Sequence, residues 1–321
     1  AMFALDANST YLDPQALALL REEQGGSIQG IGALVSPEDR TLEEGDRQCS
    51  VISETCRIYI VSTIEGAPAE GAGLQRDDVI VAVDGESIVG WTVDEVTATV
   101  RGPAGTDVTL TIERQGETFD VTITRAAVTI PVIASEMFGD VGYIRLSIFN
   151  ETADEQLRDA LTKLLCQSSE ILVIDLRNNP GGLLETAINI TSFFLPRGEV
   201  VVTEGPEGDR VYRVTGDTVV PEEVEVIVVV NKGSASASEV VTAVLQEQGR
   251  VTVVGENTFG KNTVQQRYAL SNGGAFKLTV ARWLTPGGLD FGGSGLDPDI
   301  TLEIDPGLDP ATLVELVLAA R

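Results

Sequence analysis

A serine and a lysine in this sequence are placed where they could act together. Ser236 follows the apolar run 224–230 and precedes a helical pattern at 238–249, so it would lie at a helix N-terminus, where the dipole stabilises negative charge. Lys261 follows the next apolar strand, and a strand–helix–strand return can bring it to face Ser236. A lysine acts as a base near pH 7 only if its pKa falls by several units, which burial in an apolar pocket achieves. Phe259 and the apolar strands are candidates for that burial.

Each of these residues also has a plainer interpretation. Glu239 lies three positions after Ser236, which is the spacing of a capping box, and helix starts use that pattern often. Lys261 lies in a glycine-flanked turn, where a lone lysine is ordinarily solvated. Neither residue alone indicates catalysis.

A third segment, Asp175–Gly182 (DLRNNPGG), also lies between an apolar strand and a helix. Its two glycines allow a sharp bend and a close approach to a ligand, and free N–H groups at a helix start suit an oxyanion. The alternative is a strand-to-helix turn that needs glycine only for its shape.

Alternating strands and helices over residues 127–321 predict an α/β core that positions these three segments at the ends of buried strands. The expected strands are 141–149, 170–177, 224–231 and 250–256, and the expected helices are 152–167, 185–195, 238–249 and 311–321.

The region 28–126 resembles a PDZ domain. The resemblance rests on the GIGA loop (Gly30, Ile31, Gly32, Ala33), on GAPAEGAGL and DDVIVAVDG, on the helix TVDEVTATV, and on two alternating strands that meet at Gln115-Gly116. In PDZ domains the glycine-rich loop presents N–H groups to a peptide's terminal carboxylate. The turn Gln75–Asp78 departs from the usual Pro-Gly-Asp, and an ordinary small β-rich module is the alternative.

The remaining segments carry weaker signals. Residues 1–27 are expected to form short helical pieces, and residues 36–57 an exposed loop in which Cys49 and Cys56 could pair. Cys166 is expected in the core. We see no signal peptide or membrane-spanning run, although Ala1-Met2 resembles a cloning remnant, which would mean that a natural leader or anchor was trimmed.

Composition excludes several classes of function. The chain has 321 residues, long enough for two domains, and no histidine, so a Ser-His-Asp triad, a Cys-His dyad and a His-ligated zinc site are impossible within it. Its net charge of -27 repels phosphate backbones, so nucleic acid is not expected as a partner. No metal or cofactor is expected.

Taken together, the segments STYLDP, GIGALV, DLRNNPGG, NKGSASASE, VVGENTFGKNTVQ and GLDPDI make the chain similar to the carboxyl-terminal processing (tail-specific) proteases, peptidase family S41. Ser236 and Lys261 lie 25 positions apart, the family's usual spacing. The resemblance implies that Ser236 is the nucleophile, Lys261 the base and Gln265 the residue that orients the lysine. It also implies an oxyanion hole formed by the N–H of Ala237 and of Gly181 or Gly182.

The resemblance further implies a ClpP/crotonase-like α/β protease core (127–321), an inserted PDZ domain (28–126) and a short N-terminal helical segment (1–27). The expected activity is that of a serine endopeptidase cleaving proteins near apolar C-termini, which the PDZ domain captures, with Arg76 as a candidate coupling residue. The expected location is extracytoplasmic, with a membrane anchor outside this sequence as an option. The alternatives are an inactive PDZ-based scaffold and a crotonase-like acyl-CoA enzyme.

Overall fold

The chain forms two compact units. This computed structural model describes residues 9–43, 49–206, 208–305 and 307–321. One unit is Ser27–Ile130, and the other joins Ala1–Gly26 to Pro131–Arg321. No helix in these described ranges is both long and apolar enough to cross a bilayer.

A six-stranded sheet organises the larger unit. Its strand order is β10 (Ile133–Phe138), β11 (Val141–Leu146), β12 (Ile171–Asp175), β15 (Glu225–Val230), β16 (Thr252–Gly255) and β19 (Ile300–Thr301). β10 runs antiparallel to β11, and the other neighbours are parallel. The expected strands at the centre of the core are therefore present and adjacent.

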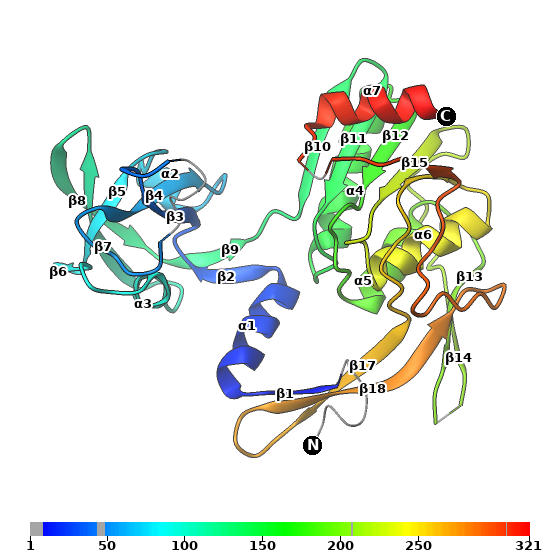
Figure 1. The fold of residues 1–321 in the computed structure, drawn as a ribbon, viewed down its shortest axis with the longest axis horizontal. Coiled ribbons are helices and arrows are strands. Elements are labelled where there is room, and N and C mark those ends of the chain that lie inside the picture. Colours follow the sequence, from blue (N-terminus) through cyan, green and yellow to red (C-terminus); the bar gives the residue numbers. More distant parts are fainter. Residues whose placement is uncertain (1–8, 44–48, 207, 306) are drawn as a thin grey trace. The chain divides into compact units, whose positions relative to one another are not determined.

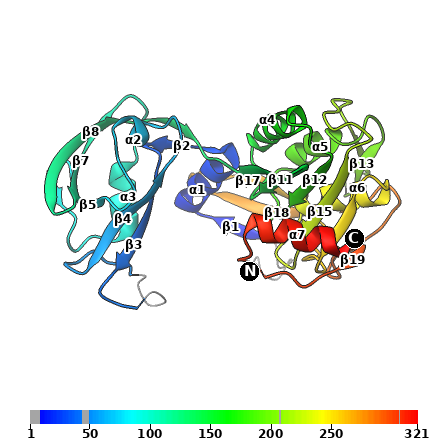
Figure 2. The same cartoon turned by 90° about the horizontal axis from the view of Figure 1, so that it is seen from above.

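Helices cover both faces of this sheet because its strands are apolar on both sides. On β15, Val228 packs into the cluster that contains α4 (Ala153–Cys166), α5 (Leu184–Ser192) and α6 (Ala237–Glu247), while the next residue, Val229, packs into the cluster that contains α7 (Pro310–Ala320). The result is a three-layer α/β/α unit (Figure 2). All four helices were expected from the sequence.

A second sheet in the larger unit was not expected. It comprises β1 (Thr10–Leu12), β13 (Glu199–Glu204), β14 (Arg210–Arg213), β17 (Thr263–Ala269) and β18 (Ala275–Leu284), with β17 and β18 forming a long hairpin (Figure 1). Helix α1 (Pro14–Gly25) follows β1 and starts at the Asp13 N-cap, within the segment 1–27 where helical pieces were expected. The expectation of helical pieces throughout 1–27 is wrong at β1, because that segment pairs with β18.

The smaller unit is a β-rich module. Its main sheet orders β3 (Ala33–Asp39), β4 (Cys56–Thr63), β5 (Val79–Val83), β7 (Asp107–Arg114) and β8 (Glu117–Thr124), with β6 (Glu86–Ser87) on β5; β2 (Ser27–Gly30) pairs with β9 (Ala126–Thr129). Its helices are α2 (Pro68–Gly71) and α3 (Val93–Val100). The β7–β8 turn has positive φ at both Gln115 and Gly116, as a type I′ hairpin requires.

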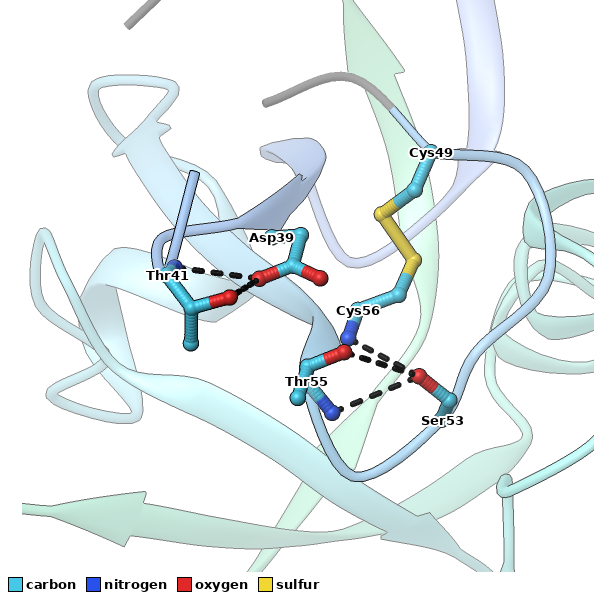
Figure 3. Close-up of a disulfide and its surroundings, with 6 residues drawn as sticks. All are labelled: Asp39, Thr41, Cys49, Ser53, Thr55 and Cys56. Carbon is cyan, nitrogen blue, oxygen red and sulfur yellow. Dashed lines mark hydrogen bonds between the residues drawn. A yellow bond between two sulfur atoms is a disulfide. The ribbon is translucent and has the colours of Figure 1, made fainter. Parts of the chain in front are cut away.

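The three cysteines differ in their surroundings. Cys49 and Cys56 form a disulfide, next to which Ser53 Oγ accepts the N–H of Cys56 at 3.0 Å (Figure 3). The expected exposed loop is shorter than 36–57, since β3 continues to Asp39 and β4 begins at Cys56. Cys166 is exposed, not in the core, because it lies two residues past Leu164, the last buried position of the α4 stripe.

Candidate active site

Three loops meet at one edge of the larger sheet. They follow β12, β15 and β16, which are adjacent and parallel, so their carboxyl ends lie side by side. A cavity of about 420 Å³ opens between the loops, and the sequence-predicted residues that line it are Gly181, Gly182, Ser236, Ala237, Lys261 and Gln265. The structure thus brings together every residue that was expected in the catalytic core.

The structure separates Ser236 from its two serine neighbours. Ser234 is fully buried and donates its hydroxyl to the carbonyl of Leu176 at 2.8 Å. Ser238 is also fully buried and donates to the carbonyl of Asn179 at 3.0 Å. Only Ser236 lines the cavity.

The backbone at Ser236 is held in an unusual conformation, with φ of 55° and ψ of −113°. Non-glycine residues with positive φ are uncommon and concentrate at functional sites. Gly181 packs directly against this bend, since a Cβ on it would lie 2.6 Å from the carbonyl oxygen of Ala235 and 2.8 Å from the Cβ of Ser236. The Pro-Gly-Gly turn therefore needs glycine at this position for close approach.

The N–H groups of the Pro-Gly-Gly turn are not equivalent. Gly181 donates its N–H to Asn179 Oδ1 at 2.9 Å. The carbonyl of Gly181 accepts the N–H of Phe149, and the N–H of Leu183 donates to the carbonyl of Phe149, so the intervening Gly182 N–H points away from Phe149. The N–H groups of Gly182 and Ala237 donate to no acceptor among the described residues.

A buried ion pair lies at the start of the same loop, and the sequence analysis missed it. Arg177 and Asp175 are at most 1% exposed, and the guanidinium meets the carboxylate through two hydrogen bonds of 2.9 and 3.0 Å. Tyr143 donates its hydroxyl to Asp175 at 2.8 Å, and burial together with this carboxylate raises the pKa of Tyr143. The network fixes the end of β12, from which the Pro-Gly-Gly turn departs. The adjacency of Asp175 and Arg177 was visible in the sequence, but Tyr143 lies in a distant strand.

Lys261 is half-buried, and its pKa is lowered. The main cause is burial, which disfavours the ammonium form; the positive charge of Lys277 lowers the pKa further, and Glu239 opposes the shift. The hydrogen bonds of the described residues include none between Lys261 Nζ and Ser236 Oγ. Phe259 does not bury Lys261 as expected, because it is 63% exposed and outside the cavity lining.

Gln265 lines the cavity with Lys261, but its hydrogen bonds run elsewhere. Its amide donates to Thr263 Oγ1 at 2.6 Å and to the Thr263 carbonyl at 3.3 Å. A register shift between β17 and β18 falls at Val264/Gln265, and such irregularities re-aim side chains near active sites. Helix α1 adds Gln24 to the lining of the cavity, and its Oε1 is buried without a hydrogen-bond partner among the described residues.

Glu239 joins the segment of the serine to that of the lysine. Its fully buried carboxylate accepts the N–H of Ser236 at 2.7 Å and the N–H of Lys261 at 2.9 Å. It also accepts the N–H of Gly260 and the hydroxyl of Thr258, both at 2.6 Å. The capping pattern noted in the sequence is therefore compatible with catalysis, because one carboxylate positions both loops.

We expect Glu239→Gln to disrupt this arrangement, since an amide presents hydrogens where the carboxylate accepted them. The free energy of unfolding, measured in urea, should fall by about 3 kcal/mol, as expected for buried donors left unpaired. Glu247→Gln is the matched control on the same helix, because Glu247 is exposed. A loss for Glu239→Gln no larger than for this control would contradict the positioning role.

The smaller unit contains its own groove, of about 80 Å³. The expected loop Gly30–Ala33 lines it on one side, and Val96 and Val100 of α3 line it on the other. Gly32 has φ of 74°, and a Cβ there would lie 2.4 Å from the Cβ of Ala67. Arg76 is exposed and does not line this groove.

Comparisons with known proteins agree with this geometry. The model of peptidase family S41 matches residues 140–302, and a PDZ domain model matches residues 59–114. The chain is 36% identical over 311 residues to a carboxy-terminal-processing protease of Bartonella bacilliformis, covering 94% of this chain and 68% of that protein. It is 34% identical to a probable CtpA-like serine protease of Staphylococcus aureus, over 93% of this chain and 57% of that protein. A solved photosystem II D1 C-terminal processing protease is similar with a TM-score of 0.57 and 30% identity, over 99% of this chain and 84% of that one.

Proposed function

We propose that Ser236 is the nucleophile of this protein and Lys261 its general base. The premise is that the chain belongs to peptidase family S41 and is a carboxyl-terminal processing serine protease. The observation that carries the proposal is that one cavity is lined both by a serine with a strained backbone, Ser236, and by a lysine with a lowered pKa, Lys261. A neutral amine is the state that can accept the serine proton.

The reaction is an acyl transfer in two halves. Lys261 takes the proton of Ser236 while the hydroxyl oxygen attacks the scissile carbonyl carbon. The lysine then gives that proton to the leaving amine as the peptide bond breaks, and an acyl-enzyme remains on Ser236. Water, deprotonated by Lys261, attacks this ester; the peptide acid departs and the proton returns to Ser236.

The oxyanion donors are the N–H groups of Ala237 and Gly182. Both line the cavity and are without a recorded acceptor among the described residues, whereas the N–H of Gly181 is engaged by Asn179. Gly181 serves instead as the contact that lets the turn approach Ser236. Removing one oxyanion donor typically costs about 100–1,000-fold in kcat.

Gln265 orients the lysine in the peptide-bound enzyme. In the structure its amide donates to Thr263, two residues earlier on β17. The Gln265 side chain therefore has to rotate before it can orient the lysine. The protease core, at 127–321, is of the ClpP/crotonase type, with residues 1–27 as an N-terminal segment.

The PDZ domain, at 28–126, captures the substrate's C-terminal tail. The groove lined by Gly30–Ala33 and the apolar face of α3 suits an apolar terminal side chain, and the loop suits the terminal carboxylate. Arg76 is the candidate residue for coupling capture to catalysis. An extracytoplasmic location is consistent with the Cys49–Cys56 disulfide.

The two alternative functions are disfavoured. An inactive PDZ scaffold would not need a serine and a pKa-lowered lysine in one cavity, and the relatives are named as proteases. A crotonase-like acyl-CoA enzyme is disfavoured by the S41 family match and by the PDZ domain.

The test is cleavage of a folded protein extended by an apolar C-terminal tail, followed by mass spectrometry of the products. The same protein with an Asp-Asp tail is the control for capture by the PDZ domain. A fluorophosphonate probe should label Ser236 and no other serine. Absence of both cleavage and labelling in the parent protein would overturn the proposal.

A further inference from the structure

Two cations on the β17–β18 hairpin face each other at the wall of the active-site cavity. Arg267 and Lys277 are direct register partners in this antiparallel pair, so their side chains lie on the same face. Both line the cavity that contains Ser236 and Lys261.

The charge of this cavity is opposite to that of the protein. The chain has 49 acidic and 22 basic residues, yet the described cavity lining includes Lys261, Arg267 and Lys277 and no Asp or Glu. Like charges directly opposite on neighbouring strands are destabilising, so their retention needs a compensating partner.

Another cation of the same hairpin, Arg282, does have acidic partners within the protein. Arg282, on β18, meets Glu204 at 3.0 Å and Asp290 at 3.4 Å. In the described part of the chain neither Arg267 nor Lys277 has an ion-pair partner. A substrate that enters this cavity would therefore meet two cations that form no ion pair among the described residues.

We propose that Arg267 and Lys277 bind a carboxylate of the peptide substrate and make the enzyme selective for an acidic group near the scissile bond. The inference rests on the proposed protease function and adds a substrate class to it. Arginine is well suited to the role because its planar fork matches a carboxylate in two parallel hydrogen bonds.

The strand geometry limits where that carboxylate lies. Lys261 precedes β17, and Thr263, Gln265 and Arg267 follow at alternate positions along the cavity wall. At about 3.3 Å per residue, Arg267 lies about 20 Å along the chain from Lys261, before the long side chains shorten the gap. The bound group is thus a few residues from the bond that is cut, and it is either an Asp or Glu side chain or the free α-carboxylate of the tail.

The experiment compares peptides that differ in one charge. A fluorogenic peptide with an apolar tail carries Glu or Gln at each successive position around the cleaved bond, and each is made with a free or an amidated C-terminus. For the parent enzyme we expect kcat/KM about tenfold higher for the favoured carboxylate than for its neutral match, the size typical of a partly exposed charged hydrogen bond. The source of the carboxylate is identified by which effect Arg267→Gln abolishes, that of Glu→Gln or that of amidation, because the loss of PDZ capture on amidation is the same in both enzymes.

The variants report on the two cations. Arg267→Gln and Lys277→Gln should bring the acidic-to-neutral ratio toward one, and Arg267→Glu should favour a Lys-containing peptide instead. Using the ratio cancels any change in the pKa of Lys261. Arg197→Gln, which removes an exposed arginine outside the cavity lining, should keep the parent ratio.

Binding separates this inference from the protease function. The same peptides are titrated into Ser236→Ala with and without Arg267→Gln, and Kd is measured by fluorescence anisotropy. The ratio of Kd for the acidic and the neutral peptide is then compared between the two proteins, which share the same capture by the PDZ domain. Equal affinities for acidic and neutral peptides in Ser236→Ala, or a preference that survives Arg267→Gln and Lys277→Gln, would overturn the inference. Cleavage of neutral peptides would leave the protease function standing in that case.

Discussion

We expect Ser236→Ala to remove proteolysis, with kcat/KM falling about 10⁴–10⁶-fold, because in the proposed mechanism the acyl-enzyme can no longer form and only binding and the oxyanion hole remain. The measurement is single-turnover cleavage of a fluorogenic tail peptide, since the residual rate will be low. The far-UV circular dichroism spectrum should match that of the parent, because the Ser236 hydroxyl faces a cavity.

Ser234→Ala is the matched control, two residues away. This variant loses a buried hydrogen bond to the Leu176 carbonyl, so we expect it to lose about 1 kcal/mol or more of stability while it still cleaves. The reverse pattern, in which Ser236→Ala cleaves and Ser234→Ala does not, would show that the nucleophile is wrongly assigned.

Lys261→Met should be the second most damaging substitution. General-base catalysis contributes about 10²–10⁴-fold, and methionine keeps most of the buried methylene stem while it removes the amine. In the parent, kcat/KM should rise with pH along a limb set by Lys261, because the ammonium form cannot accept a proton. The midpoint lies below the ordinary lysine value of 10.5 because burial lowers the pKa of Lys261. In Lys261→Met this limb disappears.

Lys277 provides an independent test of the direction in which the pKa of Lys261 is shifted. Its positive charge disfavours a second ammonium nearby, so Lys277→Gln should raise the pKa of Lys261 and shift the limb to higher pH. At neutral pH a smaller fraction of the lysine is then neutral, and cleavage of a neutral peptide slows. Lys163→Gln, an exposed change on α4, should leave the limb in place. A limb that moves to lower pH in Lys277→Gln would contradict the electrostatic explanation.

The sequence was most informative where local pattern and topology agree. Apolar runs marked β12, β15 and β16, and parallel strands place their carboxyl ends at one edge, so the meeting of the Pro-Gly-Gly turn, Ser236 and Lys261 was predictable. The α7 helix was equally visible from its apolar content.

Features set by distant contacts were not predictable in the same way. The β17–β18 hairpin contributes a wall of the cavity and was not predicted, although the alternating run KLTVARW and the Asn272-Gly273 turn are local signals for it. Phe259 was expected to cover Lys261 because it is close in sequence. Burial is decided by tertiary neighbours, and Trp283 and Val264 line the cavity instead. The proposal of Gly182 rather than Gly181 as an oxyanion donor likewise rests on Asn179 Oδ1, a partner that no spacing rule identifies.

The Glu239 carboxylate constrains how this enzyme can be switched on. This carboxylate accepts the backbone N–H of both Ser236 and Lys261, so these two backbone positions move together. A transition between inactive and active forms therefore cannot arise from a displacement of one loop relative to the other. Such a transition can instead come from rotation of the Lys261 or Gln265 side chain, or from bending of β17, which begins at Thr263. The hydrogen bonds of Glu239 therefore favour the hairpin, rather than the N-terminus of α6, as the part of the site that moves.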